Sequence, residues 1–475
     1  MPQYLSPGVY VEEVALKSRS ISGVGTSTAG FIGVVLDGVN MPAQSGQFKR
    51  YRAKADGTIA LFQVGNNNKI LFFEVDVVTG KPDPTKPTTP DKGQPIEDPS
   101  GSPLEDPKGK NFAFEFDAGG KPDLTKPTTD STKGKPIPIL YNLAPADEPQ
   151  LVTSWEEFKS KFGDFQTGNK TLAHAVYGFF NNGGTRCFVL RVNSNNGLTN
   201  LADPLALFES IDEIAIVAVP GAIQGTQHDA IIAHCVKLQD RVAVLDGDDS
   251  KDPDRVAEIR PVGRSPQGSY AALYYPWIKV FDPVSNELGK VPPSGHIAGV
   301  YARSDAARGV FKAPANEGVI GALDTSRPIS KAHQEGLNPE GINAIRVFNG
   351  AVKVWGARTL ADEETSSQFR YISTRRFFNF LRESIDQGTQ FAVFEPNTPN
   401  LWQGITQTAS GFLLNQWRDG ALFGSNPEQA FFVKCDKDTN PDDVRKLGQV
   451  VTEIGVAIVK PAEFVIFRIQ QLSGG

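Results

Sequence analysis

The sequence predicts a multidomain protein of α/β (mixed α+β) class, on three observations. Apolar, β-branched runs at 214–220 and 241–246 flank a helical pattern at 229–238, and this order and spacing indicate a βαβ unit with parallel strands. Twelve of the 34 prolines lie between residues 79 and 138, which excludes continuous helix there. The length of 475 residues suffices for roughly two to four domains with their own cores.

The two chain ends are predicted to be β-strands without a partner nearby in the sequence. Residues 6–14 (SPGVYVEEV) and 463–470 (EFVIFRIQ) are rich in β-branched and aromatic side chains. An open strand edge is a template for another chain, so we expect subunits to complete each other's sheets. The alternative is that both runs are internal strands of the monomer's own sheet. The residues expected to form these arm strands are Val9, Tyr10, Val11, Val14, Phe464, Val465, Ile466, Phe467 and Ile469.

The N-terminal third holds one apolar strand and then a segment of different character. Residues 29–36 (AGFIGVVL) form a short run typical of a buried strand. Between 37 and 148 short strand-like runs alternate with turn signals, and residues 80–89 recur almost unchanged at 120–129. Two copies are too few for a solenoid. We therefore expect a small β-rich domain whose repeated Lys/Pro/Thr segments are two long solvated loops.

The middle of the chain continues the α/β pattern. A helix is predicted at 155–163, with Ser154 as its N-cap and Gly163 as its end. A second helix is predicted at 172–180, and a strand follows at 187–192.

The final third alternates long amphipathic helices with short strands. The helices are predicted at 374–387 and 401–418, with Gly388 and Gly420 as their ends. A short helix is expected after Asn440 as its cap. The expected strands are 391–395, 428–435, 450–459 and 464–469.

Composition restricts the partners and the compartment. The formal net charge is −6, without the basic excess that a nucleic-acid partner requires. The start of the chain lacks the pattern of a signal peptide, and no apolar run approaches the roughly 20 residues that span a bilayer. We expect folding in the cytoplasm of the producing cell. Cys187, Cys235 and Cys435 lie in apolar surroundings and are interpreted as buried thiols.

No catalytic, metal or cofactor site is predicted. Gly-Lys pairs lack P-loop spacing, and no nucleophile elbow occurs. His228 and His234 would lie roughly 120° apart on a helix, too divergent to share a metal easily, so we expect one exposed and one packed histidine. Residues 246–252 are rich in Asp, as calcium loops are, but lack the closing Glu, which favours a solvated loop.

Several strings resemble contractile tail sheath proteins. They begin with 6–13 and 23–29 (GVGTSTA) and continue with 291–299 (VPPSGHIAG) and 308–316 (RGVFKAPAN). The remaining strings, in family order, are 341–343, 354–359, 371–376, 430–436 and 460–466. The chain looks closest to the sheaths of phage-tail-like extracellular contractile injection systems, and it departs from the pattern at about 37–148.

The resemblance implies a structural, non-enzymatic sheath subunit without cofactors. Its implied partners are further copies of itself in helically stacked hexameric rings, the inner tube protein, baseplate and tail-terminator proteins, and other sheath paralogues. Nucleic acid and membrane insertion are not expected. Assembly would take place in the cytoplasm, and the product would be part of a virion-like or extracellular contractile particle. Arg375 and Arg376 could contact the tube or form a solvated helix start, and we expect the latter.

The resemblance also implies a domain order. Residues 1–36 would be an N-terminal arm and the first strand of the core sheath domain, and 37–148 an exposed β-rich insertion. Residues 149–340 would be an inserted α/β domain, 341–459 the C-terminal sheath domain and 460–475 the C-terminal arm. The C-terminal domain, built from both chain ends, would lie nearest the tube. Two alternatives remain: a minor sheath paralogue at the baseplate or tail end, and an enzyme on the α/β domain.

Overall fold

The computed structural model describes residues 20–48 and 141–466, with single strands between 50 and 140. It divides into two compact units. The larger comprises residues 1–39, 144–158 and 164–475, and the smaller comprises 40–143 with 159–163. No helix among the described residues is both long and apolar enough to cross a membrane.

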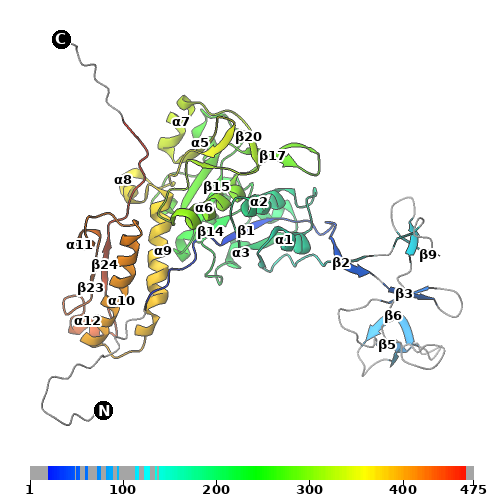
Figure 1. The fold of residues 1–475 in the computed structure, drawn as a ribbon, viewed down its shortest axis with the longest axis horizontal. Coiled ribbons are helices and arrows are strands. Elements are labelled where there is room, and N and C mark those ends of the chain that lie inside the picture. Colours follow the sequence, from blue (N-terminus) through cyan, green and yellow to red (C-terminus); the bar gives the residue numbers. More distant parts are fainter. Residues whose placement is uncertain are drawn as a thin grey trace, which may run out of the picture. The chain divides into compact units, whose positions relative to one another are not determined.

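The larger unit is built on a twisted sheet of nine strands (Figure 1). The six central strands are parallel, and antiparallel strands lie at both edges. Because the central strands are covered on both faces, they are almost continuously apolar. The order is β12 (Gln150–Val152), β13 (Cys187–Val192), β1 (Ala29–Val34), β14 (Ile216–Ala218), β15 (Val242–Asp246), β16 (Ala271–Tyr275), β21 (Ile342–Phe348), β22 (Ala351–Val354) and β19 (Glu317–Gly318).

Two neighbouring residues of β1 show which helices cover which face of the sheet. The Phe31 ring packs against Phe179 of α2 (Lys170–Asn181), with 5.4 Å between centroids. Ile32 belongs instead to a core that contains Leu205 of α3 (Ala202–Ala206) and Ile231 of α4 (Gly225–Leu238). Consecutive strand residues point to opposite faces, so α2 and the α3–α4 pair lie on opposite sides.

Helix α6 (Ser294–Arg308) packs closely on α2. A Cβ on Gly295 would lie 2.4 Å from backbone atoms of Ala175, so only glycine permits this approach. The other short helices of this part are α1 (Trp155–Phe162), η1 (Asn195–Leu198), α5 (Val256–Ile259), η2 (Gln267–Tyr270), α7 (Lys331–Leu337), η3 (Asn338–Glu340), α8 (Glu363–Ser366) and η4 (Ser367–Phe369). A separate sheet has the order β18 (Glu287–Val291), β17 (Ile278–Asp282) and β20 (Ala322–Thr325).

The C-terminal part of the larger unit has its own core. Helix α9 (Ile372–Thr389) packs on α10 (Pro399–Arg418), and α10 packs on the hairpin of β23 (Phe431–Lys434) and β24 (Glu453–Val456). The remaining elements are η5 (Gln390–Ala392), α11 (Pro427–Ala430) and α12 (Asp442–Lys446). The core is formed by Ile21, Val310, Phe377, Leu381, Phe412, Leu413, Ala421, Leu422 and Ala430.

The smaller unit contains only strands in its described part, apart from the end of α1. The two sequence repeats form equivalent strand pairs: residues 72–75 pair with 82–88 and residues 113–116 pair with 122–128, so that Phe73 opposes Pro87 and Phe114 opposes Pro127. The strands are β2 (Ala43–Phe48) with β11 (Pro138–Leu140), β3 (Arg50–Ala53) with β4 (Ile59–Phe62), β5 (Phe72–Val75) with β6 (Pro82–Thr88) and β7 (Gln94–Pro95), and β8 (Ala113–Phe116) with β9 (Pro122–Thr128) and β10 (Gly134–Lys135).

The repeats correct one expectation. The Lys/Pro/Thr segments are strands β6 and β9 and not solvated loops. Both are edge strands, and proline is tolerated at a sheet edge because its missing N–H leaves no internal ladder bond unmade.

Strand β1 lies in a different sheet from the one expected. It pairs with β13 and β14 in the middle of the nine-stranded sheet, and β21 and β22 belong to the same sheet. From the sequence we expected the strands now numbered β1, β21 and β22 to belong to the C-terminal sheath domain. The pairing of β1 with β13 could not be recognised in the sequence, because the insertion between β1 and β12 separates these strands by more than a hundred residues.

The C-terminal elements are partly as predicted. Strand β13 in the middle of the chain and helices α9 and α10 match their predicted runs, and β23 and β24 lie within theirs. Residues 428–430 belong to helix α11, and no strand is assigned to 464–466. Residues 391–395 form the 3-10 turn η5 and a loop and pair with none of the described strands. Gly388 does not end α9, which continues to Thr389; it is needed instead because a Cβ there would lie 2.4 Å from Ile21.

Candidate assembly surfaces

The chain enters the larger unit along α9. Ile21 is buried in the C-terminal core, and the backbone N–H of Val24 donates to Ser384 Oγ at 3.1 Å. These contacts hold residues 21–24 against the C-terminal part of the larger unit. The predicted arm residues Val9, Tyr10, Val11 and Val14 lie outside the described residues.

A buried ion pair joins the N-terminal segment, at Thr26 and Ser27, to both parts of the larger unit. Asp305 of α6 pairs with Arg376 of α9 at 2.5 Å and accepts hydrogen bonds from Thr26 Oγ1 at 2.7 Å and Ser27 Oγ at 3.3 Å. Arg376 also donates to the Thr26 carbonyl at 3.0 Å and lies over the Tyr301 ring. The side chains of Asp305 and Arg376 are 5% and 3% exposed, so this pair is shielded from solvent.

Arg375 and Arg376 therefore differ from the solvated helix start that the sequence suggested. Arg375 donates to Ser269 Oγ at 2.9 Å and lies over the rings of Phe369 and Tyr270. Burial lowers the pKa of Arg375 to about 10. Adjacent arginines at a helix start usually face water, and only the tertiary structure supplies these aromatic and acidic neighbours.

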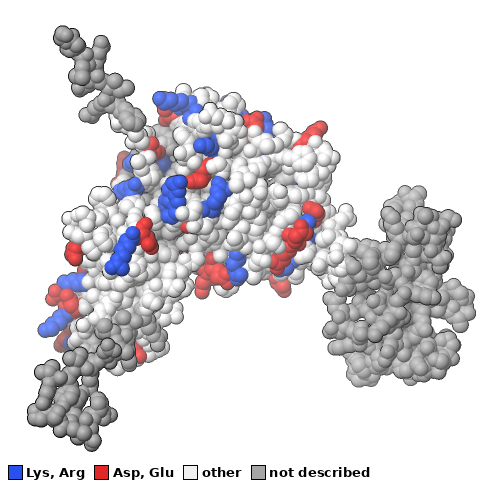
Figure 2. All heavy atoms as spheres, viewed as in Figure 1, with Lys and Arg blue, Asp and Glu red and all other residues white. Residues whose placement is uncertain are grey.

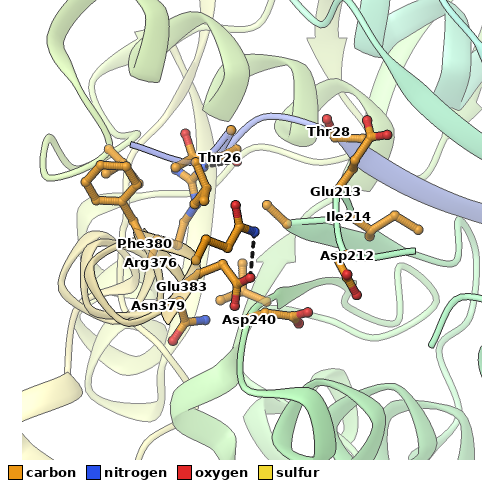
Figure 3. Close-up of a pocket in the computed structure, with 16 residues that line it drawn as sticks. Thr26, Thr28, Asp212, Glu213, Ile214, Asp240, Arg376, Asn379, Phe380 and Glu383 are labelled. Carbon is orange, nitrogen blue, oxygen red and sulfur yellow. Dashed lines mark hydrogen bonds between the residues drawn. The ribbon is translucent and has the colours of Figure 1, made fainter. Parts of the chain in front are cut away.

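A crevice of about 250 Å³ lies where residues 24–28, the loop before β14 and α9 meet (Figure 3). Its rim carries Asp212, Glu213, Asp240 and Glu383. Arg186 pairs with Glu213 at 2.6 Å, Arg241 pairs with Asp240 at 2.7 Å, and Gln387 donates to Glu383 at 2.8 Å. Each of these pairs lies within one of the two parts, so the carboxylates of Glu213, Asp240 and Glu383 are held on their own side of the crevice.

The β23–β24 hairpin is a sheet of two strands with exposed apolar side chains around it. Phe432 on β23 is 57% exposed, and Phe423 and Leu447 are each 73% exposed. Among the described residues no further named strand joins this sheet, although Leu422 makes one bridge with Ile458. Unpaired strand edges beside exposed apolar side chains are favourable positions for a strand from another chain.

The C-terminal segment leaves the hairpin and is held again at Glu463. The Glu463 carboxylate accepts hydrogen bonds from Arg358, Asn338 and Tyr371. Burial alone would raise its pKa, but the hydrogen bonds from Arg358, Asn338 and Tyr371 outweigh burial and lower the pKa. These residues line a groove of about 1280 Å³ that also contains Trp355.

The predicted arm residues next to Glu463 are solvent-exposed. Phe464, Val465 and Ile466 are 70%, 70% and 80% exposed, and no strand is assigned to them. Phe467 and Ile469 lie outside the described residues. Sequence reasoning missed Glu463 as an anchor; the available signal was one carboxylate directly before an apolar run.

Four of the five histidines, His174, His228, His234 and His296, and the three cysteines are buried. His228 and His234 are both buried, which corrects the expectation that one is exposed; desolvation lowers the pKa of His234 to about 4. The three cysteines are free and buried, as predicted. In the described part of the chain no cluster of three or more His, Cys, Asp or Glu could hold a metal.

Asn440 and the acidic loop after β15 also have structural roles. Asn440 does not cap α12; its side chain exchanges two hydrogen bonds with the backbone of Val451. Asp246 accepts hydrogen bonds from the N–H groups of Gly221 and Ser294 and from Ser294 Oγ. It thereby joins the ends of β14 and β15 to the start of α6.

On the face shown in Figure 2, the described residues form no large patch of one charge. Figure 2 shows Lys and Arg side chains interspersed with Asp and Glu over this face. Alternating charges of this kind suit protein contacts better than a nucleic-acid backbone.

Two family models match adjacent parts of the chain. The phage tail sheath protein central domain matches residues 198–360, and the phage tail sheath C-terminal domain matches 364–471. Together they cover more than half of the chain. A prophage major tail sheath protein of Pseudomonas aeruginosa (strain UCBPP-PA14) is 26% identical over 288 residues, 59% of this chain and 70% of that protein. The tail sheath protein of Burkholderia phage BcepMu is 25% identical over 221 residues, 43% of this chain and 45% of that protein.

Solved structures match over the whole length. The helical sheath of the anti-feeding prophage in its contracted state has a TM-score of 0.63 at 25% identity, and the match covers 98% of this chain and 99% of that one. The sheath complex of the extracellular contractile injection system PVC, also contracted, has a TM-score of 0.62 at 24% identity, with 100% and 99% covered. The chain therefore belongs to the contractile tail sheath family.

Proposed function

We propose that this tail sheath subunit polymerises as a helical tube around an inner tube and contracts to drive that tube through a target envelope. The observation that carries the proposal is the match to the contracted helical sheath of the anti-feeding prophage, which covers nearly the full length of both chains. The members of this family are structural proteins, and the protein is a structural subunit and not an enzyme.

Subunits connect through their terminal arms in this proposal. Residues 1–20 and 460–475 add as strands to sheets of neighbouring copies, and the free edges of the β23–β24 hairpin are the candidate acceptors. Each backbone hydrogen bond contributes about 0.5–1.5 kcal/mol net, and the same contacts repeat at every subunit. The exposed Phe464, Val465 and Ile466 support this arrangement, because they lack cover within the described chain.

Contraction is then a rigid-body change between subunits joined by arms. A head-to-tail contact that does not close on itself builds an open helix, and rings can rotate and stack closer while the arms keep them connected. The proposed partners are further copies in stacked hexameric rings, the inner tube protein, baseplate and tail-terminator proteins, and other sheath paralogues. Assembly in the cytoplasm and function in an extracellular particle follow from the same proposal.

The domain roles are also proposals. The C-terminal part, with α9, α10 and the hairpin, lies nearest the tube, the α/β part lies outside it, and the 37–148 insertion decorates the outer surface. The insertion supports a second candidate role, that of a minor sheath paralogue at the baseplate or tail end.

Electron microscopy of purified protein tests the arm-exchange sheath. The full chain is compared with a version that lacks residues 1–16 and 464–475 and so retains Glu463. We expect tubes or stacked rings from the full chain and dispersed particles from the truncation. Equal assembly by both would refute arm exchange, and compact monomers from both would refute the main-sheath role.

A further inference from the structure

The last described stretch of the chain passes from one part of the larger unit to the other. Strand β24 and residues 457–459 belong to the C-terminal part, where Val459 N–H donates to the Ala421 carbonyl at 3.2 Å. Four residues further on, Glu463 is bound by Asn338 of η3 and Arg358 after β22, which belong to the α/β part, and by Tyr371, which precedes α9 where the two parts join. In Figure 1 this segment runs upward past α8, away from the hairpin.

The Glu463 carboxylate is fully engaged. Oε1 accepts from Asn338 Nδ2 at 2.6 Å and from Arg358 Nε at 2.9 Å. Oε2 accepts from the second nitrogen of Arg358 at 2.8 Å and from the Tyr371 hydroxyl at 2.8 Å. The two bonds from Arg358 form a bidentate pair, the strongest and most directional geometry for a carboxylate.

The groups that hold Glu463 are themselves fixed to the nine-stranded sheet. The Arg358 side chain is 9% exposed, and its backbone exchanges hydrogen bonds of 2.7 and 2.8 Å with the side chain of Asn343 in β21. Asn343 also donates to the Leu273 carbonyl of β16 at 3.1 Å. A continuous series of hydrogen bonds therefore joins Glu463 to two central strands.

We propose that Glu463, Arg358, Asn338 and Tyr371 form a clasp that anchors the start of the C-terminal arm on the α/β part of the subunit. Force on the arm in an assembled sheath is then transmitted to the nine-stranded sheet. It is not carried by the β23–β24 hairpin, from which the chain leads to the arm. This inference rests on the proposed arm exchange for its role in assembly, while the anchoring itself is a property of the single chain.

The position of the clasp determines how much of the C-terminal chain is free to move. If Glu463 is released, the preceding backbone bond along the described chain is that of Val459 to Ala421. The arm then gains four residues of slack, about 13 Å at the reach of an extended chain. A strand that must add to a neighbour in one register tolerates far less than this, because a slip of one residue turns every side chain to the other face.

The test compares Glu463→Ala, Glu463→Gln and Tyr371→Phe with the full wild-type chain. Glu335→Gln is the matched control, because Glu335 lies in the same groove but is 69% exposed. Cleavage after Phe464 by chymotrypsin is followed by mass spectrometry in the unassembled fraction, with each rate divided by that of a peptide of residues 459–468 carrying the same substitution, and tube formation is followed by electron microscopy. We expect cleavage about ten- to a hundredfold faster in Glu463→Ala, a smaller increase in Tyr371→Phe, no change in the control, and loss of ordered tubes in the same order.

The outcomes separate the clasp from arm exchange. Unchanged cleavage after Phe464 in Glu463→Ala overturns the anchor, whereas faster cleavage with normal tubes overturns its role in assembly, because the arm would then not depend on it. If Glu463→Ala loosens the whole fold, Tyr371→Phe decides, since it removes one hydroxyl and keeps the ring. If the truncation lacking 464–475 assembles as the full chain does, arm exchange has failed, whereas the cleavage rates still report on the clasp.

Discussion

The carboxylate of Asp305 and the guanidinium of Arg376 lie 2.5 Å apart at the place where three segments of the chain meet. Asp305 lies in the last turn of helix α6 of the α/β part, Arg376 lies in the second turn of α9 of the C-terminal part, and Thr26 of the N-terminal segment is hydrogen-bonded to both. One buried pair thus joins the two parts of the larger unit to the N-terminal segment.

Removing one member of this pair is expected to lower the free energy of unfolding. Asp305→Ala leaves the Arg376 charge buried without its partner, and we expect a loss of about 3–5 kcal/mol in the free energy of unfolding. Arg308→Gln replaces an exposed residue of the same helix as Asp305 and should alter the free energy of unfolding by less than about 0.5 kcal/mol. Urea denaturation measures both. Equal stabilities would show that the pair does not hold the junction.

The second prediction concerns Gly388. A Cβ there would lie 2.4 Å from Ile21, so Gly388→Ala must displace Ile21 from the C-terminal core and should destabilise by about 1–3 kcal/mol. Gly404→Ala in α10 meets nothing within 4 Å and should stabilise by up to about 1 kcal/mol through helix propensity. Opposite shifts in Tm are therefore expected. A stabilising Gly388→Ala would contradict the close packing of Ile21.

Sequence reasoning identified the family, the long helices and most buried strands, because these follow from local periodicity and short strings. It could not place β1 beside β13, since the insertion separates them and strand order is not a local property. It also read Arg375 and Arg376 as solvated and Gly388 as a helix end. In each case a residue distant in the sequence, Asp305, Ser269 or Ile21, changes the environment that the local pattern suggests.

Asp246 should make stability depend on pH in an unusual direction. Desolvation raises its pKa from 3.8 to about 6, against the hydrogen bonds from Gly221 and Ser294. The native state then binds more protons than the unfolded chain between about pH 4 and pH 6, so its contribution to stability falls as pH rises through this window. The difference between wild type and Asp246→Asn in denaturation free energy, measured from pH 4 to 7, isolates this group. A difference that is flat or rises with pH would contradict the raised pKa.

The final prediction concerns the exposed start of the proposed C-terminal arm. Phe464 and Ile466 are 70% and 80% exposed, so Phe464→Ser with Ile466→Ser should change the stability of the single chain by less than about 0.5 kcal/mol. If these side chains pack on a neighbouring subunit, the same double variant should lose the burial of two apolar groups at every contact, about 1.5–3 kcal/mol each. Because a sheath repeats the contact, we expect the protein concentration needed for tubes to rise at least tenfold by sedimentation. Phe281→Ser, on an apolar residue of β17 that is 52% exposed, is the control and should leave that concentration unchanged. Normal assembly of the double variant would show that these residues do not form the subunit contact.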